Sequence, residues 1–111
     1  MSFKHAWYIE RDGHVAPAVD LEEWSVFMND NKNKRVDRTD LPWGGWVSTV
    51  FLGIDHSLEE EGPPVLYESM VFADMEMQDM DTERYCTRDE AKAGHEQMVQ
   101  KWQTNPPAEA P

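Results

Sequence analysis

Four side chains that can bind metal ions or transfer protons lie in or beside the apolar segments of this sequence. Asp55 and His56 end the apolar stretch "WVSTVFLGI". Glu68 lies inside a second apolar segment, "VLYESMVF", and His95 falls among apolar positions near the C-terminus. Carboxylates and imidazoles are the ordinary protein ligands of zinc, manganese and iron. The candidate set for a small metal-dependent enzyme is therefore Asp55, His56, Glu68 and His95.

A structural interpretation accounts for the first two of these residues. Adjacent residues of a strand point to opposite faces of the sheet. Asp55 and His56 therefore cannot both point inward unless the strand has ended or bulged. In that case Asp55 would fix a polar turn at the strand end. The spacing of the four residues also matches no metal-binding motif.

Glu68 and His95 have a structural interpretation as well, because buried polar groups are usually hydrogen-bonded. His95 could bond a main-chain carbonyl. The candidate donors to the Glu68 carboxylate are Ser48, Thr49 and Arg84. We favour a structural polar network of Glu68, Arg84 and His95 without a cofactor, and keep the metal site as the alternative.

A second group of candidates would bind a partner. Trp43 and Trp46 flank the two glycines of "LPWGGW". Tryptophan is frequent at binding hot spots, although both rings could instead fold back on the core. Together with Asp55 and His56 they are the candidate binding residues. Three methionines would be semi-exposed and adaptable, namely Met75, Met77 and Met80.

Local signals predict a hairpin followed by a helix in the N-terminal third. The "DG" pair at positions 12 and 13 is typical of a tight turn between two strands. Asp20 and Glu23 then form a capping-box-like pattern that begins a helix. The apolar face of this helix would consist of Leu21, Trp24, Phe27 and Met28.

Two long strands follow, at 46–56 and 65–72, and the sequence favours an antiparallel pairing between them. Weaker strands are expected at 34–38 and 84–86. The acidic, methionine-rich segment 73–83 is expected to be an irregular connection.

Thr87 and Glu90 form a second capping box and open a C-terminal helix. Its apolar stripe, with positions three and four apart, would be Ala91, His95, Met98, Val99 and Trp102. We therefore predict an α+β fold in which an antiparallel sheet of about four to five strands carries two helices on one face.

The chain has 111 residues, which is the size of one domain. We expect that domain at 1–103, followed by a disordered tail at 104–111. No apolar run approaches the roughly 18 residues of a membrane span, and the first residues lack a secretory signal. The single cysteine, Cys86, excludes an intrachain disulfide, so the sequence favours the cytosol.

The formal net charge is −12, from 22 acidic and 10 basic residues. Such a surface repels phosphate backbones, so we expect no direct binding to nucleic acid. The acidity could serve solubility alone, or it could engage a basic partner. The basic residues are uneven, with "KNKR" at 32–35 forming a small patch.

Three separated blocks resemble a family of small proteins found mainly in bacteriophages and prophages. The blocks are "VSTVFLGIDHS", "GPPVLYESMVF" and "ERYCTRDEAKAGHEQMV". They are similar in order to that family's pattern of two strands and a helix, and they span residues 47 to about 99. The resemblance implies a phage accessory protein without an established activity. The segments "LEEEG" and "ADMEMQDMD" depart from the family's short or glycine-rich loops.

These observations lead to one functional hypothesis and two alternatives. We expect a non-enzymatic protein of the host-cell cytoplasm that binds a host or viral protein, for example to inhibit a host or defence protein. Its acidic residues would steer the association and apolar anchors would hold the complex. The alternatives are the metal-dependent enzyme and a homodimer formed through a sheet edge or the "LPWGG" loop.

Overall fold

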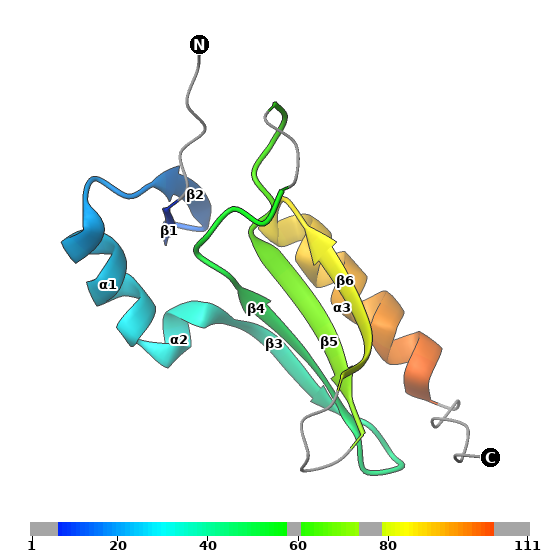
Figure 1. Cartoon of the computed structure of the whole chain (residues 1–111). Helices are drawn as coiled ribbons and strands as arrows, with labels where there is room; N and C mark the ends of the chain where they lie inside the picture. Colours follow the sequence, from blue (N-terminus) through cyan, green and yellow to red (C-terminus); the bar gives the residue numbers. More distant parts are fainter. Residues whose placement is uncertain (1–6, 58–60, 74–78, 104–111) are drawn as a thin grey trace.

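The computed structural model describes residues 7–57, 61–73 and 79–103, which form an α+β fold (Figure 1). The predicted fold class is thereby confirmed. The strands are β1 (Tyr8–Arg11), β2 (His14–Pro17), β3 (Arg35–Asp40), β4 (Trp46–Phe51), β5 (Tyr67–Phe72) and β6 (Asp79–Tyr85). The helices are α1 (Leu21–Asn29), α2 (Asn31–Lys34) and α3 (Arg88–Gln103).

The six strands divide into two antiparallel sheets. β1 and β2 form a separate hairpin, whereas the larger sheet has the order β3-β4-β5-β6. In the hairpin turn, Asp12 and Gly13 have φ angles of 52° and 82°, a left-handed pair that glycine and aspartate tolerate. The "DG" pair therefore forms the predicted turn.

Both predicted capping boxes begin helices. The Asp20 carboxylate accepts the backbone N–H of Glu23 at 2.8 Å, and the Glu23 carboxylate accepts the N–H of Val19 at 2.9 Å. At α3, Thr87 Oγ1 accepts the N–H of Glu90 at 3.1 Å, and the Glu90 carboxylate accepts the N–H of Thr87 at 3.0 Å. These reciprocal bonds satisfy amides that no helical carbonyl can reach.

The last strand is longer than expected. β6 pairs with β5 from Asp79 to Tyr85, so the prediction of an irregular segment through residue 83 is wrong for 79–83. The acidic composition of this segment is compatible with a strand because β6 lies at the edge of the sheet, where side chains can reach solvent. Met75 and Met77 lie outside the described residues, as do the side chain of Met80 and the predicted tail at 104–111.

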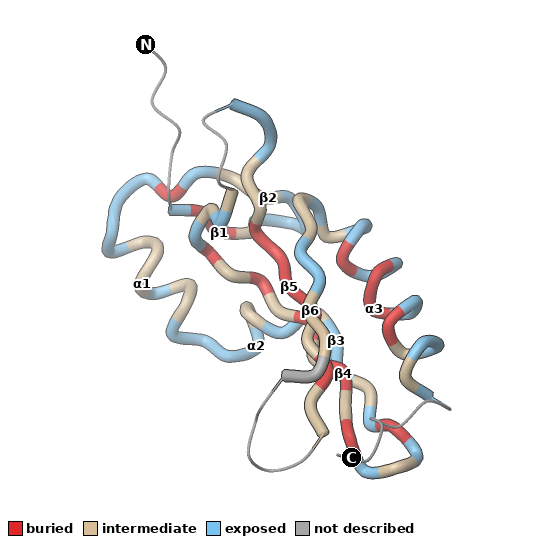
Figure 2. Tube along the Cα trace, turned by 45° about the vertical axis from the view of Figure 1, so that its right-hand side comes forward, coloured by how far each residue is buried: buried red, intermediate tan, exposed pale blue. Residues whose placement is uncertain are grey.

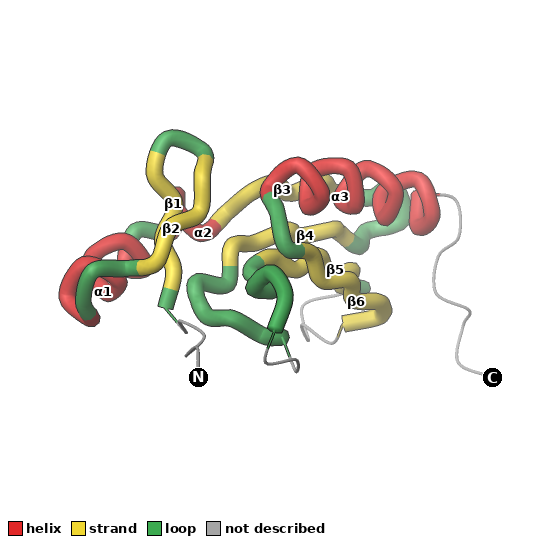
Figure 3. Tube along the Cα trace, turned by 90° about the horizontal axis from the view of Figure 1, so that it is seen from above, coloured by secondary structure: helices red, strands yellow, loops and turns green. Residues whose placement is uncertain are grey.

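α3 covers one face of the four-stranded sheet, so the sheet has a covered face and an open face (Figure 3). In β4 the alternate residues Val47, Thr49 and Phe51 are at most 1% exposed, whereas their neighbours are half-buried. The buried positions therefore gather under α3 and along the middle strands (Figure 2). One apolar cluster centres on Phe51 and Tyr67, and the other on Val47 and Val71. The predicted stripe of α3 supplies Ala91 to the first cluster and Met98 to the second.

α1 lies beside the hairpin, beyond the end of the sheet (Figure 1). It reaches the covered side through Phe27, whose ring lies 5.8 Å from that of Phe51. Trp24 anchors the helix by donating its indole N–H to the carbonyl of Gly53 at 2.9 Å. Leu21 was expected on the apolar face, but it lies in the first turn of α1 and is 59% exposed, so the buried part of that face begins at Trp24.

A close contact between α3 and β6 generates the first prediction. Gly94 packs directly on the ring of Tyr85, so an added methyl group would overlap that ring. An alanine in place of a helical glycine normally stabilises a protein by about 1 kcal/mol. We expect the opposite sign for Gly94→Ala, with the free energy of unfolding lowered by about 1–3 kcal/mol because of overpacking.

Urea unfolding followed by circular dichroism measures this change. The exposed neighbour Lys92→Ala is the matched control on the same helix and should change the free energy by less than about 0.5 kcal/mol. A Gly94→Ala protein at least as stable as the parent would contradict the contact.

The C-terminal end of α3 is tied to β6 by Asp81. Its carboxylate accepts hydrogen bonds from Lys101 Nζ at 2.8 Å and from the Trp102 indole at 2.9 Å. The hydrogen bond from Lys101, followed by that from Trp102, holds the pKa of Asp81 below its ordinary value. Since the folded pKa is depressed, the stabilisation is present above the unfolded value of about 3.9 and is lost as the pH falls through the folded pKa.

We therefore expect Asp81→Asn to lower the thermal midpoint at pH 7 and to have less effect as the solution is acidified below about pH 4. Differential scanning calorimetry across this pH range measures the gap between the two proteins. Glu96→Gln, which alters an exposed carboxylate on α3, is the control. A gap that stays constant down to the lowest pH would refute the role of the Asp81 charge.

Candidate functional site

Asp55 closes the turn that follows β4. Its Oδ1 accepts the backbone N–H of Ser57 at 2.8 Å and that of Val65 at 2.9 Å, joining the two sides of the connection between β4 and β5. The exposed His56 is bound locally, with Nδ1 2.7 Å from the carbonyl oxygen of Ile54. Asp55 thus holds a loop together, and its carboxylate is engaged by main-chain amides.

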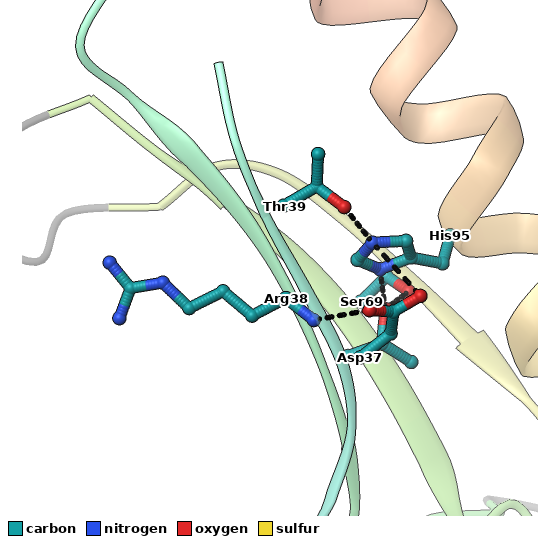
Figure 4. A network of polar contacts seen from close by, with 6 residues as sticks. Asp37, Arg38, Thr39, Ser69 and His95 are labelled. Carbon is teal, nitrogen blue, oxygen red and sulfur yellow. Dashed lines mark hydrogen bonds and ion pairs between the residues drawn. The ribbon is translucent and has the colours of Figure 1, made fainter.

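His95 is fully buried between α3 and the sheet, where both ring nitrogens contact hydroxyl groups (Figure 4). Nδ1 lies 2.7 Å from Thr49 Oγ1, and Nε2 lies 2.8 Å from Thr39 Oγ1. Thr49 Oγ1 is in turn hydrogen-bonded to Ser69 Oγ. We call the side chains of Thr39, Thr49, Ser69 and His95 the polar seam. The expectation that His95 bonds a main-chain carbonyl is wrong, because these hydroxyls occupy both nitrogens.

Two members of the polar seam, Thr49 and Ser69, share one row of the sheet with Asp37, and Thr39 lies in the next row. Asp37 of β3, Thr49 of β4 and Ser69 of β5 are cross-strand neighbours. The Asp37 carboxylate accepts the N–H of Arg38 at 2.8 Å, and its other oxygen lies 3.7 Å from His95 Nε2. A neutral imidazole has one donor and one acceptor, and hydroxyls can play either role, so the seam can be satisfied throughout. Thr49, Ser69 and His95 are each 0% exposed, so no substrate reaches them and the seam is a structural element.

Glu68 lies on the opposite side of the sheet from His95. It precedes Ser69 in β5, and adjacent strand residues point to opposite faces. Its carboxylate accepts the Nε–H of Arg84 at 2.8 Å across β5 and β6. The predicted network of Glu68, Arg84 and His95 is therefore divided by the sheet into two separate groups.

The same geometry separates the alternative metal ligands. Asp55 and His56 belong to the loop after β4, while Glu68 and His95 lie on opposite faces of the sheet. Within residues 7–57, 61–73 and 79–103, no group of three or more histidine, cysteine, aspartate or glutamate side chains is close enough to hold a metal ion.

The two candidate tryptophans differ in environment. Trp43 folds back on the covered side, where it packs against the cluster of Val47 and Met98 and donates its indole N–H to the carbonyl of Trp102 at 2.7 Å. Trp46 belongs to the open face, is half-buried, and stacks on Phe72 with the ring centroids 5.4 Å apart. Only Trp46 presents part of its ring at a surface that no described helix covers.

A further exposed cluster was not predicted. Trp7 and Ile54 pair in an isolated antiparallel bridge and are 40% and 38% exposed. The Trp7 ring packs edge-on against Trp24, with the centroids 4.5 Å apart, and Leu21 lies one turn before Trp24 on α1. We call Trp7, Leu21, Trp24 and Ile54 the apolar end. Sequence reasoning placed Leu21 and Trp24 on one face of a helix, but no local signal indicated that Trp7 and Ile54 would pair nearby.

Comparisons with known proteins identify no relative. No family model matches the chain, and no curated protein and no solved structure matches it. The site must therefore be interpreted from its own geometry. None of the helices in the described part of the chain combines the length and apolar character that crossing a membrane requires.

The polar seam generates a stability prediction. Thr49→Val keeps the shape of the side chain but leaves His95 Nδ1 and Ser69 Oγ without their shared partner. An unsatisfied buried group costs about 1–3 kcal/mol, so we expect the free energy of unfolding to fall by that amount. Ser48→Ala, a half-buried hydroxyl of the same strand on the open face, is the control and should have a smaller effect.

The apolar replacement Thr49→Val, Ser69→Ala and His95→Leu removes all three polar partners together. None of these three positions then holds an unpaired polar group, and the hydroxyl that loses His95, that of Thr39, belongs to a half-buried residue. We therefore expect the triple variant to recover much of the stability lost in Thr49→Val. Urea unfolding of the parent, Thr49→Val and the triple variant measures the order of their free energies of unfolding. A triple variant that loses the sum of the single effects would contradict the coupling.

Proposed function

We propose that this chain is a protein-binding module, an accessory protein of the phage type that acts by docking on a host or viral protein. The observation that carries the proposal is the apolar end. Three of the five large hydrophobic side chains that are exposed among the described residues belong to this end, namely Trp7, Leu21 and Ile54; the other two are Val19 and Val26. Clustered exposed apolar groups of this kind are typical of interaction sites.

The apolar end is held rigidly to the sheet. The backbone N–H of Tyr8 donates to the carbonyl of Gly53 at 2.8 Å, and the indole of Trp24 donates to the same carbonyl. Gly53 has a φ of 74° and lies against Met28 and Trp24, where a side chain would not fit. A surface that is already ordered loses little conformational entropy when a partner binds. Tryptophan is moreover the residue most enriched at binding hot spots.

The acidic residues around the apolar end favour a partner with a basic surface. Asp20, Glu22 and Glu23 lie at the start of α1, and Glu23 pairs with Arg11. With a net charge of −12 over the chain, a basic protein surface is attracted at long range and an acidic one is repelled. The acidic residues would thus raise the association rate while Trp7 and Leu21 bury apolar area in the complex. Blocking a contact of the bound host protein is how such docking would inhibit it.

Affinity capture with matched variants tests this function. The immobilised chain should retain a specific protein from a bacterial extract at low salt and release it as the salt rises to about 0.5 M, where charges are screened beyond about 4 Å. Leu21→Gln and Trp7→Ala should each weaken the captured interaction about tenfold, because they remove apolar contact area.

The control is Val26→Gln, which removes an apolar residue that is 68% exposed on another side of α1. It should bind like the parent chain. The proposal fails if nothing is retained at low salt, or if Leu21→Gln and Trp7→Ala bind as well as the parent. Light scattering on the same samples detects a homodimer that would occupy the apolar end instead.

A further inference from the structure

The open face of the large sheet is a second surface with a different character. Its side chains form rows across the strands, because directly paired residues point to the same side. Trp46 pairs with Phe72 in one row, and Ser48 pairs with Met70 in the next. Val50 pairs with Glu68 in the third. No described helix lies on this side of the four strands (Figure 3).

The centre of the open face is apolar and partly accessible. Trp46, Val50, Met70 and Phe72 are half-buried, in contrast to the fully buried Val47 and Val71 on the covered side. The stacked rings of Trp46 and Phe72 give the centre a flat aromatic floor. Such a floor can pack against the apolar side chains of a ligand.

Arginines border this floor on both sides. Arg35 and Arg38 come from β3, where they pair with Val50 and Ser48, and Arg84 comes from β6. The guanidinium of Arg38 lies 5.1 Å from the centre of the Trp46 ring, so cation and ring present one continuous surface. Three of the chain's ten basic residues therefore border one side of the sheet.

The two described carboxylates of this face are paired with arginines. Glu68 is buried against Arg84, and Asp40 lies 3.3 Å from Arg38. Arg35 has no ion pair within the described residues, so the three arginines of this face outnumber its two described carboxylates by one. A locally cationic, aromatic face is unexpected in a chain with a net charge of −12.

We propose that the open face binds an extended acidic polypeptide segment that also carries apolar side chains. Alternate residues of an extended chain point to opposite sides, so one set can lie on Trp46 and Met70 while carboxylates at the margins reach Arg35 and Arg38. Guanidinium–carboxylate contacts are strong and directional. This surface lies apart from the apolar end and selects the opposite charge, so the two sites can be occupied by different segments.

The size of the face favours a segment over a second copy of this chain. Four strands about 4.8 Å apart and six residues long cover roughly 15 by 17 Å. Stable protein pairs bury about 800 Å² on each partner, far more than this area. A single-stranded nucleic acid also stacks on aromatic floors, but its many phosphates meet the repulsion of the whole acidic chain.

Two synthetic peptides test the proposal on the full chain. One alternates glutamate with leucine and phenylalanine, and the other has lysine in place of each glutamate. The indole N–H signal of Trp46 in nitrogen-15 NMR spectra, assigned with Trp46→Phe, reports occupancy of the open face. We expect the glutamate peptide to bind at least about tenfold more tightly than the lysine peptide, the effect of one charge-assisted contact.

Matched variants locate the contact. Arg35→Gln with Arg38→Gln should weaken binding of the glutamate peptide about tenfold, whereas Lys92→Gln on α3 and Leu21→Gln at the apolar end should leave it unchanged. Both arginines are exposed, so the double variant should keep the fold, and its circular dichroism spectrum verifies this.

Several outcomes would overturn the inference. They are equal or tighter binding of the lysine peptide, no shift of the Trp46 signal with either peptide, or insensitivity to the arginine changes. A single-stranded oligonucleotide that binds more tightly than the glutamate peptide would assign the face to nucleic acid. A homodimer that Trp46→Ala dissociates would assign it to a second copy. None of these results tests the apolar end, which the affinity-capture experiment tests independently.

Discussion

The polar seam beneath α3 is the constraint on which the rest of the structure depends. His95 projects from α3 onto the covered face of the sheet. Its two ring nitrogens are hydrogen-bonded there to the hydroxyl groups of Thr39 and Thr49. Apolar packing alone would allow α3 to slide or rotate over the strands, because it is not directional. The hydrogen bonds of a buried imidazole are directional, because a shifted helix or a shifted strand would leave the ring nitrogens without partners. The seam thus specifies one position of the helix and one register for β3, β4 and β5.

Because α3 packs on one face of the four-stranded sheet, the opposite face is left without a described helix over it. The hairpin and α1 gather at the end of the sheet, where Phe27 reaches Phe51, and they leave the second face to solvent. That face shows the features of a surface adapted to partial exposure, with stacked aromatics at its centre and paired charges at its margins. The described residues therefore present two separate apolar areas, one beside the acidic start of α1 and one bordered by arginines.

Local signals in the sequence predicted most of the elements and little of the site. The "DG" turn, both capping boxes and the stripe from Ala91 to Trp102 depend on neighbours in the chain, so they could be identified in isolation. The length of β6 could not, because acidic residues form a strand there only by pairing with β5. Likewise Glu68 and His95 appeared as one group, since a sequence does not reveal that a sheet lies between them. The exposure of Leu21 depends on how the whole of α1 packs, which is a tertiary property.

The outer edge of β3 has features that disfavour pairing with a strand of a second copy of this chain. The register shifts between Arg35 and Asp37, and the Asp37 side chain takes up the amide of Arg38. An edge strand whose backbone N–H is already bonded to a side chain of the same strand is a poor template for pairing with another strand. The register shift also bends the strand, which makes a regular ladder with a second chain harder to form. The β3 edge is therefore a poor place for a second copy of the chain to add a strand, so contacts between this protein and other molecules are directed to its faces and ends.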